Sequence, residues 1–271
     1  LRDEIFAEWI NKVDSLIQDE RGHSILELIL DDAIDYSDET TELPIEKVQL
    51  VIFAIQVALG ELLKAHGAKP GALIGQSLGE AAAAYFAGGL SLEDATRTIC
   101  SRAHLMGEGE AMIAGTDQEG AMAVVELSRE ALAEFVEKHE QAAGVEPAVY
   151  AGPGMTTVGG PSQAVDYLVE ALTAEEKFAR KLNVRGAGHT SALDPIMGDL
   201  AGEIAGIEAK PLRVPLFTSV DRGEVYQPGQ TVHDDQYFLR MTRQPVYFQD
   251  ATEAAFNAGH TTLVEITPNP V

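Results

Sequence analysis

Hydrophobic positions recur along this chain with two periods, and the changes between them divide it into predicted helices and strands. Residues 2–19 repeat apolar positions every three or four residues, which predicts an amphipathic helix, and 24–30 predicts a short second one. Residues 45–65 are apolar nearly all round, with Gln49 and Gln56 as the polar exceptions. A helix of that composition is buried, so 45–65 is the predicted core helix.

The next part predicts a strand, a tight turn and two helices. The apolar run 72–74 leads into segment 75–80 (Gly-Gln-Ser-Leu-Gly-Glu) and an alanine-rich helix that stops at 88–89, where two glycines follow each other. Ser91 has the position of an N-cap, and the helix that it starts is expected to reach Met106.

The middle of the chain has a different rhythm. Its short runs predict strands and helices in the order β-α-β-β-α-β, typical of a small ferredoxin-like unit. We place this unit as an insert at 119–186, between the two halves of a larger unit, 1–118 and 187–271. The remaining predicted elements are strands at 215–220 and 262–266 and helices at 237–241 and 248–258.

Composition narrows the possible partners. Among 271 residues, 19 Lys+Arg against 43 Asp+Glu give a net charge of −24, which argues against duplex nucleic acid and anionic membranes as main partners. No membrane insertion and no metal site are expected. The single cysteine, Cys100, excludes a disulfide within the chain and favours the cytoplasm. Because the sequence lacks an initial Met, we expect it to be an excised or processed piece of a longer protein.

The segment Gly75-x-Ser77-x-Gly79 fits a nucleophile elbow. In that turn between a strand and a helix, glycines leave room for a sharp bend that holds the serine hydroxyl outward. The N-terminus of the following helix then offers backbone N–H groups and a positive dipole end to an oxyanion. The alternative is a purely structural turn.

A nucleophilic serine needs a base. One histidine, His189, lies in a loop of small residues (186–191) directly after a predicted strand, where catalytic residues are commonly placed. It is therefore the favoured base among seven candidates. The others are His23, His66, His104, His139, His233 and His260.

Arg102 occupies an unusual position on its predicted helix. The apolar stripe of that helix runs through Leu92, Ala95, Ile99 and Met106, and position 102 falls on it. A buried guanidinium must be paired. It either forms a structural ion pair with a carboxylate of this chain or holds a substrate carboxylate with both of its terminal nitrogens.

These residues match a known family. Segment 75–80 resembles the Gly-His-Ser-x-Gly-Glu elbow of malonyl-CoA:acyl carrier protein transacylases and of the acyltransferase domains of type I polyketide and fatty acid synthases. Arg102 follows Ser77 at the family's spacing. Further blocks that match the family in order are 48–50, 91–95, 102–106, 188–195, 243–248 and 264–271.

The resemblance implies an α/β fold, in which an α/β-hydrolase-like large subdomain with a parallel sheet carries the inserted ferredoxin-like subdomain. It implies Ser77 as nucleophile, His189 as base and the Leu78 N–H as oxyanion donor. It implies further that Arg102 binds the free carboxylate of a malonyl-type group. Gln49, Gln76, Met106 and Gly188 would line the substrate site, and a backbone carbonyl near Asn269 would orient His189 without a triad Asp.

The reaction implied is transfer of a 2-carboxyacyl group from CoA to the phosphopantetheine thiol of an acyl carrier protein domain, through an acyl-serine. The carrier domain and a neighbouring ketosynthase would belong to the same polypeptide. No bound cofactor is expected, since acyl-CoA and the carrier arm are the substrates.

Three departures from the family pattern stand out. The N-terminal Gly-Gln-Gly-x-Gln segment, which supplies a second oxyanion donor and a central strand, is not found here. Gln76 replaces the usual His before the nucleophile. Residues 186–189 read Gly-Ala-Gly-His, where malonyl-selective domains have His-Ala-Phe-His and methylmalonyl-selective ones Tyr-Ala-Ser-His. Two glycines predict an open pocket wall and a long 2-alkyl substituent, a combination similar to acyltransferase domains of mycobacterial mycolic acid synthesis.

Two other classes remain open on the sequence. A serine hydrolase, such as a thioesterase or lipase, shares the elbow but normally uses a Ser, Asp/Glu and His triad and needs no buried arginine. A patatin-like Ser/Asp pair is disfavoured by His189. A non-enzymatic docking scaffold would keep the fold without turnover.

Overall fold

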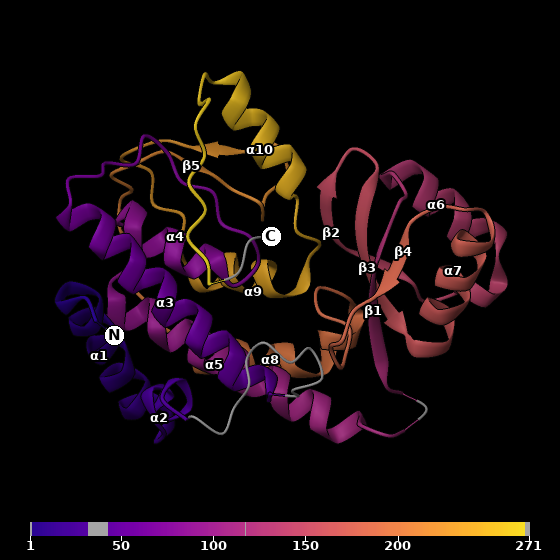
Figure 1. Cartoon of the computed structure of the whole chain (residues 1–271), viewed down its shortest axis with the longest axis horizontal. Coiled ribbons are helices and arrows are strands. Elements are labelled where there is room, and N and C mark those ends of the chain that lie inside the picture. Colours follow the sequence, from indigo (N-terminus) through magenta and orange to yellow (C-terminus); the bar gives the residue numbers. More distant parts are fainter. Residues whose placement is uncertain (1, 32–42, 117, 269–271) are drawn as a thin grey trace.

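The computed structural model describes residues 2–31, 43–116 and 118–268. The predicted role of Asn269 therefore lies outside the described residues. Figure 1 shows two parts side by side. The large part (2–116 and 182–268) is mainly helical, and the small part (118–181) is a sheet with two helices against it.

The large part is built on α3, Ile45–Ala65, which has the bounds that the pattern predicts. It packs against α1, α4 and α5, and its Leu50 and Phe53 are fully buried. Polar N-caps start four of the described α-helices of this part, from Asp3, Ser24, Ser91 and Asp234. The helices of this part besides α3 are α1 Glu4–Arg21, α2 Ile25–Ile29, α4 Gly79–Ala87, α5 Leu92–Ile113, the 3-10 turn η2 Ser191–Ile196, α8 Met197–Glu203, α9 Asp235–Arg243 and α10 Phe248–Asn257.

By length and hydropathy alone, α3 is also the one helix among the described residues that could cross a membrane. Core helices of folded domains pass the same test. Here α3 packs against α1, α4 and α5 of the large part (Figure 1).

The small part has the element order that its sequence predicts. A four-stranded antiparallel sheet has the order β2-β3-β1-β4, and α7 packs against β1, β3 and β4. Val125, Val158 and Leu168 lie in its separate core. Its elements are β1 Gly120–Val125, α6 Arg129–Lys138, the 3-10 turn η1 Glu140–Ala142, β2 Glu146–Gly152, β3 Met155–Pro161, α7 Ser162–Ala174 and β4 Ala179–Lys181.

The strands predicted for the large part are mostly not formed. Within the described residues, the one parallel bridge inside the large part joins Leu73 and Leu216, and a second parallel bridge joins its Val246 to Val149 of the small part. β5, Leu216–Phe217, pairs antiparallel with β6, Val225–Tyr226. The prediction of a strand at 262–266 is wrong for this structure, and Leu263 and Val264 are 52% and 69% exposed. A strand depends on hydrogen bonds to a neighbouring strand, and the described residues place none beside 262–266.

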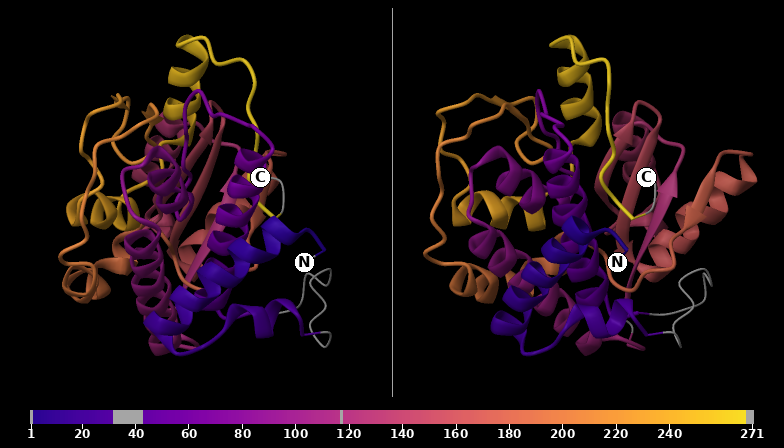
Figure 2. Two further views of the ribbon diagram at one scale, coloured as in Figure 1. Left: turned by 90° about the vertical axis from the view of Figure 1, so that its left-hand side faces the viewer. Right: turned by 60° about the vertical axis from the view of Figure 1, so that its left-hand side comes forward.

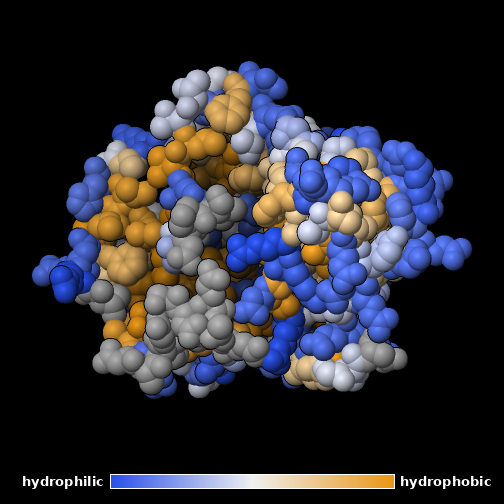
Figure 3. Space-filling model, turned by 45° about the vertical axis from the view of Figure 1, so that its right-hand side comes forward, coloured by the Kyte–Doolittle hydropathy of each residue, from blue (hydrophilic) through white to orange (hydrophobic). Residues whose placement is uncertain are grey.

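The two parts are joined by backbone hydrogen bonds. The N–H of Tyr150 on β2 donates to the Val246 carbonyl (2.9 Å), and the Val246 N–H donates to the Ala148 carbonyl (2.8 Å). Residue 246 is thus fixed to the small part just after α9 ends. The right-hand view of Figure 2 shows the small part standing beside the helices of the large part. On the face in Figure 3, apolar side chains gather over the large part and polar ones cover much of the small part.

Candidate active site

Ser77 lies in a strained turn at the start of α4. Its φ of 53° is in the left-handed region, which a residue with a side chain rarely adopts. Gly75 makes the turn possible, because a Cβ there would come within 2.5 Å of the Glu80 Cα. The predicted sharp turn is therefore present, and it aims the Ser77 hydroxyl away from the helix that follows.

His189 is the histidine that meets Ser77. The Ser77 Oγ lies 2.7 Å from its Nε2, and its Nδ1 lies 3.0 Å from the backbone carbonyl of Gln244. A carbonyl only accepts, so Nδ1 carries the proton and Nε2 is free to accept the serine proton. His189 also has a positive φ of 60°. Strain at both partners marks the pair as a functional site.

The environment keeps His189 neutral. It is 4% exposed, and burial, followed by the charge of Arg102, lowers the pKa of its imidazole to about 3. A neutral imidazole is the form that acts as a general base.

Arg102 lies beside Ser77 and has no carboxylate partner among the described residues. Its Nη2 donates to the Ser77 Oγ (3.2 Å), and its Nη1 donates to the Gln49 Oε1. Its Nε has no partner among the described residues. Burial lowers the pKa of Arg102 to about 10. Of the two alternatives for Arg102, the structural ion pair is thus not formed among the described residues, and within them no carboxylate compensates the buried cation next to Ser77.

Gln49 and Met106 lie together next to this cation. The Gln49 Nε2 donates to the Met106 Sδ (3.6 Å), so α3 and α5 meet at the site. Gly188 lies next to two methionines, since a Cβ there would be in van der Waals contact, at 3.9 Å, with Met106 Cε and with Met122 Sδ. Met122, on β1 of the small part, was not among the expected residues.

Gly186 differs from Gly188. Its φ is 81°, and a Cβ there would lie 2.9 Å from the Glu110 side chain. Glycine at 186 is therefore needed for the turn and for the close approach of Glu110. Of the two glycines expected to open the pocket wall, only Gly188 borders the methionines.

The expected oxyanion donor is available. Leu78 is the N-cap of α4, and no described acceptor takes its N–H, whereas the Gly79 N–H donates to the Gln76 carbonyl (2.9 Å). Gln76 is half-buried at the start of the turn. The carbonyl that orients His189 among the described residues is that of Gln244.

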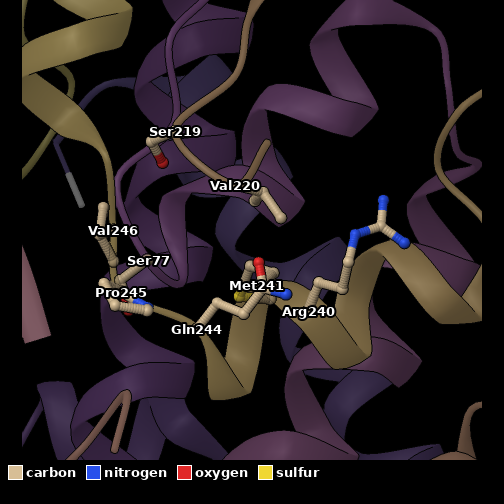
Figure 4. A pocket seen from close by; sticks show the side chains of 8 residues that line it. All are labelled: Ser77, Ser219, Val220, Arg240, Met241, Gln244, Pro245 and Val246. Atoms are coloured by element: carbon tan, nitrogen blue, oxygen red, sulfur yellow. The ribbon is translucent and has the colours of Figure 1, made fainter. Parts of the chain in front are cut away.

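A narrow pocket adjoins Ser77 on the side of α9. In Figure 4 the side chain of Arg240 points away from Ser77, and that of Ser219 comes from the loop above α9. Asp221 holds the Arg240 guanidinium at 2.9 and 3.0 Å. The pocket is lined by Ser77, Ser219, Val220, Arg240, Met241, Gln244, Pro245 and Val246.

Sequence reasoning missed Gln244 as a functional residue. Every residue carries a carbonyl, so no side-chain pattern could identify the one that faces Nδ1. Among the described residues, no group of three His, Cys, Asp or Glu side chains is placed to hold a metal ion. The chemistry that the site can perform is acyl transfer through a serine ester, with a built-in cation for a carboxylated substrate.

The comparisons agree with that class. The acyl transferase domain family model matches residues 1–271, and the chain belongs to this family of acyltransferases. A mycocerosic acid synthase-like polyketide synthase of Mycobacterium tuberculosis is 37% identical over 269 residues, which cover 98% of this chain. The chain spans only 12% of the length of that relative.

Solved structures show the same fold, so the fold is α/β. The acyltransferase domain of the polyketide synthase PpsC of Mycobacterium tuberculosis is 28% identical, with a TM-score of 0.84 over 98% of this chain and 76% of that domain's chain. The acyl transferase domain of SpnD, solved in complex with 2-(pent-4-yn-1-yl)malonyl, is 26% identical, with a TM-score of 0.80 over 98% of this chain and 60% of its own. The hydrolase alternative is not favoured.

Proposed function

We propose that this acyltransferase domain moves a 2-carboxyacyl group from CoA to the phosphopantetheine thiol of an acyl carrier protein domain, as part of a polyketide synthase. The group is of the malonyl type and carries a long 2-alkyl substituent. Ser77 is the nucleophile and forms the intermediate ester.

One observation carries the proposal. The Arg102 guanidinium is buried beside Ser77 with only neutral partners, Gln49 and Ser77 itself. Burying a cation without an anion is costly, so the site lacks one carboxylate. A 2-carboxyacyl group supplies it, because its free carboxylate lies two bonds from the thioester carbon that Ser77 attacks.

The reaction proceeds in two transfers. Ser77 attacks the thioester carbonyl as His189 Nε2 takes its proton, and the oxyanion is held by the Leu78 N–H. The CoA thiolate leaves with the proton from His189. The carrier thiol then gives its proton to His189 and attacks the acyl-Ser77 ester, which restores the serine hydroxyl. Gln244 keeps the imidazole in the required tautomer throughout.

The size of the 2-substituent is inferred from Gly188. A Cβ at 188 would touch the flexible side chains of Met106 and Met122, so glycine leaves unfilled the volume that a side chain would take beside them. A neighbour of this fold, SpnD, has been solved with a 2-(pent-4-yn-1-yl)malonyl group, which supports the acceptance of an extended 2-alkyl chain. The relatives include a mycocerosic acid synthase-like polyketide synthase and a phthioceranic/hydroxyphthioceranic acid synthase.

The partners follow from the reaction. The carrier domain and a ketosynthase are proposed to lie in the same polypeptide, where tethering raises the effective concentration of an acidic carrier at an acidic surface. The cytoplasm is the proposed location. The large part is proposed to be an α/β-hydrolase-like subdomain (1–118 and 187–271), into which a ferredoxin-like subdomain (119–186) is inserted.

The intact mass of the protein tests this function. After mixing with malonyl-CoA or with a long-chain 2-alkylmalonyl-CoA, a covalent adduct is expected, larger in yield for the long-chain donor. Ser77→Ala should abolish it. Addition of a phosphopantetheine-bearing carrier domain should then remove the adduct and acylate the carrier.

Other outcomes would contradict the proposal. Release of free acid without carrier acylation would indicate a hydrolase. Failure of Ser77 to react with either CoA ester or with a fluorophosphonate would indicate a docking scaffold.

A further inference from the structure

We propose that Glu80 is a positioning residue of the acyl transfer, whose carboxylate ties α4 to α9 and thereby holds Ser77 and His189 at reacting distance. This role rests on the Ser77–His189 pair of the proposed function. Nothing in the sequence pattern beyond membership of the elbow pointed to it.

Glu80 is completely buried directly behind the nucleophile. It is the second residue of α4, and its N–H donates to the Ser77 carbonyl (2.9 Å). Its backbone also closes the turn against Gly75. Any movement of Glu80 therefore moves the turn that aims the Ser77 hydroxyl.

The carboxylate binds two other segments of the chain. Its Oε1 accepts the backbone N–H (2.9 Å) and the hydroxyl (2.8 Å) of Ser219, and its Oε2 accepts the hydroxyl of Tyr237 (2.8 Å). The Tyr237 Oη also lies 2.7 Å from the Thr218 Oγ1, and since its own proton goes to Glu80, Thr218 is the donor there. Thr218 thus donates to Tyr237, and Tyr237 donates to Glu80, so this series of hydrogen bonds ends on the Glu80 carboxylate.

The segments that contain Ser219 and Tyr237 both connect to Gln244, whose carbonyl orients His189. Tyr237 lies in α9, whose C-cap is Gln244, the residue whose carbonyl accepts the proton of His189 Nδ1. The Ser219 carbonyl accepts the N–H of Tyr247 (2.7 Å), on the other side of Gln244. Glu80 therefore joins the nucleophile turn to both flanks of the Gln244 carbonyl.

Stability alone does not explain a carboxylate here. No Lys, Arg or His among the described residues contacts Glu80, and its donors are all neutral. A buried charge of this kind is less favourable for folding than a well-packed apolar side chain. Its three directed hydrogen bonds do, however, fix the geometry of α4 against α9, which an apolar side chain cannot do.

The same contacts make the positioning depend on pH. Burial raises the pKa of Glu80 to about 7, opposed by the hydrogen bonds from Ser219 and Tyr237 and assisted by the charge of Asp221. Of the groups facing it, Tyr237 comes from α9, and Asp221 follows Ser219 and is paired with Arg240. Only the ionised carboxylate accepts all three hydrogen bonds, since a protonated one must donate.

His189 cannot produce a rate change near neutral pH, because its pKa lies near 3. The kcat/KM profile reports groups of the free enzyme. A rise of kcat/KM with pH around 7 that Glu80→Gln removes and Glu110→Gln retains is therefore assigned to Glu80.

Glu80→Gln tests this assignment, because glutamine keeps the shape and cannot ionise. We measure acylation of the whole chain by malonyl-CoA and labelling of Ser77 by a fluorophosphonate between pH 5.5 and 8.5. The wild type is expected to gain about tenfold in both rates across pH 7. Glu80→Gln is expected to stay near the low-pH rate at every pH, with KM changed less than twofold.

Glu110→Gln is the matched control. Burial also raises the pKa of Glu110 to about 7, against the charge of Arg185, and Glu110 adjoins the Gly186 turn before His189. This variant is expected to keep the wild-type profile. Tyr237→Phe removes a hydrogen bond that lowers the pKa of Glu80, so the rise of both rates should move to higher pH in this variant. Persistence of the rise in Glu80→Gln, its loss in Glu110→Gln, or wild-type rates in Glu80→Gln at all pH values would each overturn the proposal.

Because the fluorophosphonate carries no carboxylate, its labelling rate tests Glu80 independently of the acyl donor. Lack of acylation by any 2-carboxyacyl-CoA, with normal labelling, would contradict the proposed substrate and leave the role of Glu80 in place.

Discussion

The two sides of Ser77 each hold one buried ionisable side chain, and the two differ in how completely their polar atoms are hydrogen-bonded. On the side of α3 and α5, Arg102 has neutral partners and a guanidinium nitrogen without any among the described residues. On the side of α4 and α9, Glu80 accepts three hydrogen bonds from Ser219 and Tyr237. An incomplete set of partners indicates a place for a ligand, whereas a complete set indicates a fixed support.

This contrast also separates binding from positioning. Arg102 reaches the Ser77 hydroxyl directly, so it acts on whatever reacts there. Glu80 reaches the same serine only through the backbone of the turn. Substitutions on the two sides should consequently change different observables, namely the choice of acyl group on one side and the geometry of the catalytic pair on the other.

The largest expected effect is that of Arg102→Ala. Removing the cation should lower acylation of Ser77 by malonyl-CoA by about 10²–10³-fold, the equivalent of roughly 3–4 kcal/mol for a buried charge pair. Acylation by acetyl-CoA, which has no carboxylate, should change by less than about tenfold. Rapid-quench acylation followed by intact mass measures both rates.

Arg97→Ala is the control for this variant, because Arg97 lies on the same helix but donates to the carbonyls of Glu203 and Ala205. It should leave the preference between the two donors unchanged. Equal losses on malonyl-CoA and acetyl-CoA in Arg102→Ala would show that the cation does not select carboxylated groups.

The second effect concerns stability on the α4 side. The pKa of Glu80 is raised from 4.5 to about 7 in the folded chain. The folded state therefore binds the proton more tightly, and the contribution is present below pH 4.5 and lost as pH rises through 7. Relative to Glu80→Gln, the wild type should lose up to about 3 kcal/mol of unfolding free energy across that window.

Urea unfolding of both proteins at pH 5 and pH 8.5 measures this loss. The exposed Glu137→Gln on α6 provides the control and should follow the wild type at both pH values. If the difference between wild type and Glu80→Gln is the same at both pH values, Glu80 does not titrate in this range. Greater stability of Glu80→Gln at pH 8.5, combined with slower acylation, would directly separate positioning from folding.

A smaller effect on the choice of acyl group is expected at Gly188, next to Met106 and Met122. Gly188→Leu places a side chain between Met106 and Met122. It should reduce acylation by a long-chain 2-alkylmalonyl-CoA about tenfold relative to malonyl-CoA, since pocket volume of this size discriminates by roughly 1–3 kcal/mol. Competition between the two donors, read by intact mass, gives the ratio. Gly198→Leu, at an exposed position of α8, should leave it unchanged.

Local pattern was sufficient for the helices of this chain and for the small part. The bounds of α3 follow from its apolar composition, and α5 starts at its Ser91 cap. It continues beyond the predicted end, Met106, to Ile113, because Gly107 and Gly109 take the helical conformation and do not end the helix. The large-part strands depend on pairing partners distant in sequence, and Leu73 finds only Leu216.

The residues of the site likewise divide into those that local sequence could predict and those that depend on distant contacts. Ser77, His189 and Arg102 could be found because their side-chain types and spacing carry chemistry, and the structure brings all three together. The residues that hold Ser77 and His189 in place could not be predicted from the sequence. Ser219 and Tyr237 lie 139 and 157 positions from Glu80, and the Gln244 carbonyl has no side-chain signature.

The smallest expected effect is at the junction of the two parts. Asp250 on α10 accepts hydrogen bonds from Arg129 on α6 (2.8 Å) and from Arg222 (2.9 Å). Asp250→Asn should cost about 1 kcal/mol of unfolding free energy and make stability less dependent on salt, because the pair with Arg129 is partly exposed. Acylation should change less than twofold, since neither Arg102 nor Glu80 contacts this junction.

Asp166→Asn, which breaks the exposed pair with Lys181 inside the small part, is the control and should cost less unfolding free energy. A tenfold loss of acylation in Asp250→Asn at unchanged stability would mean that the small part is held over Ser77 by this junction, and that positioning is not confined to the Glu80 side.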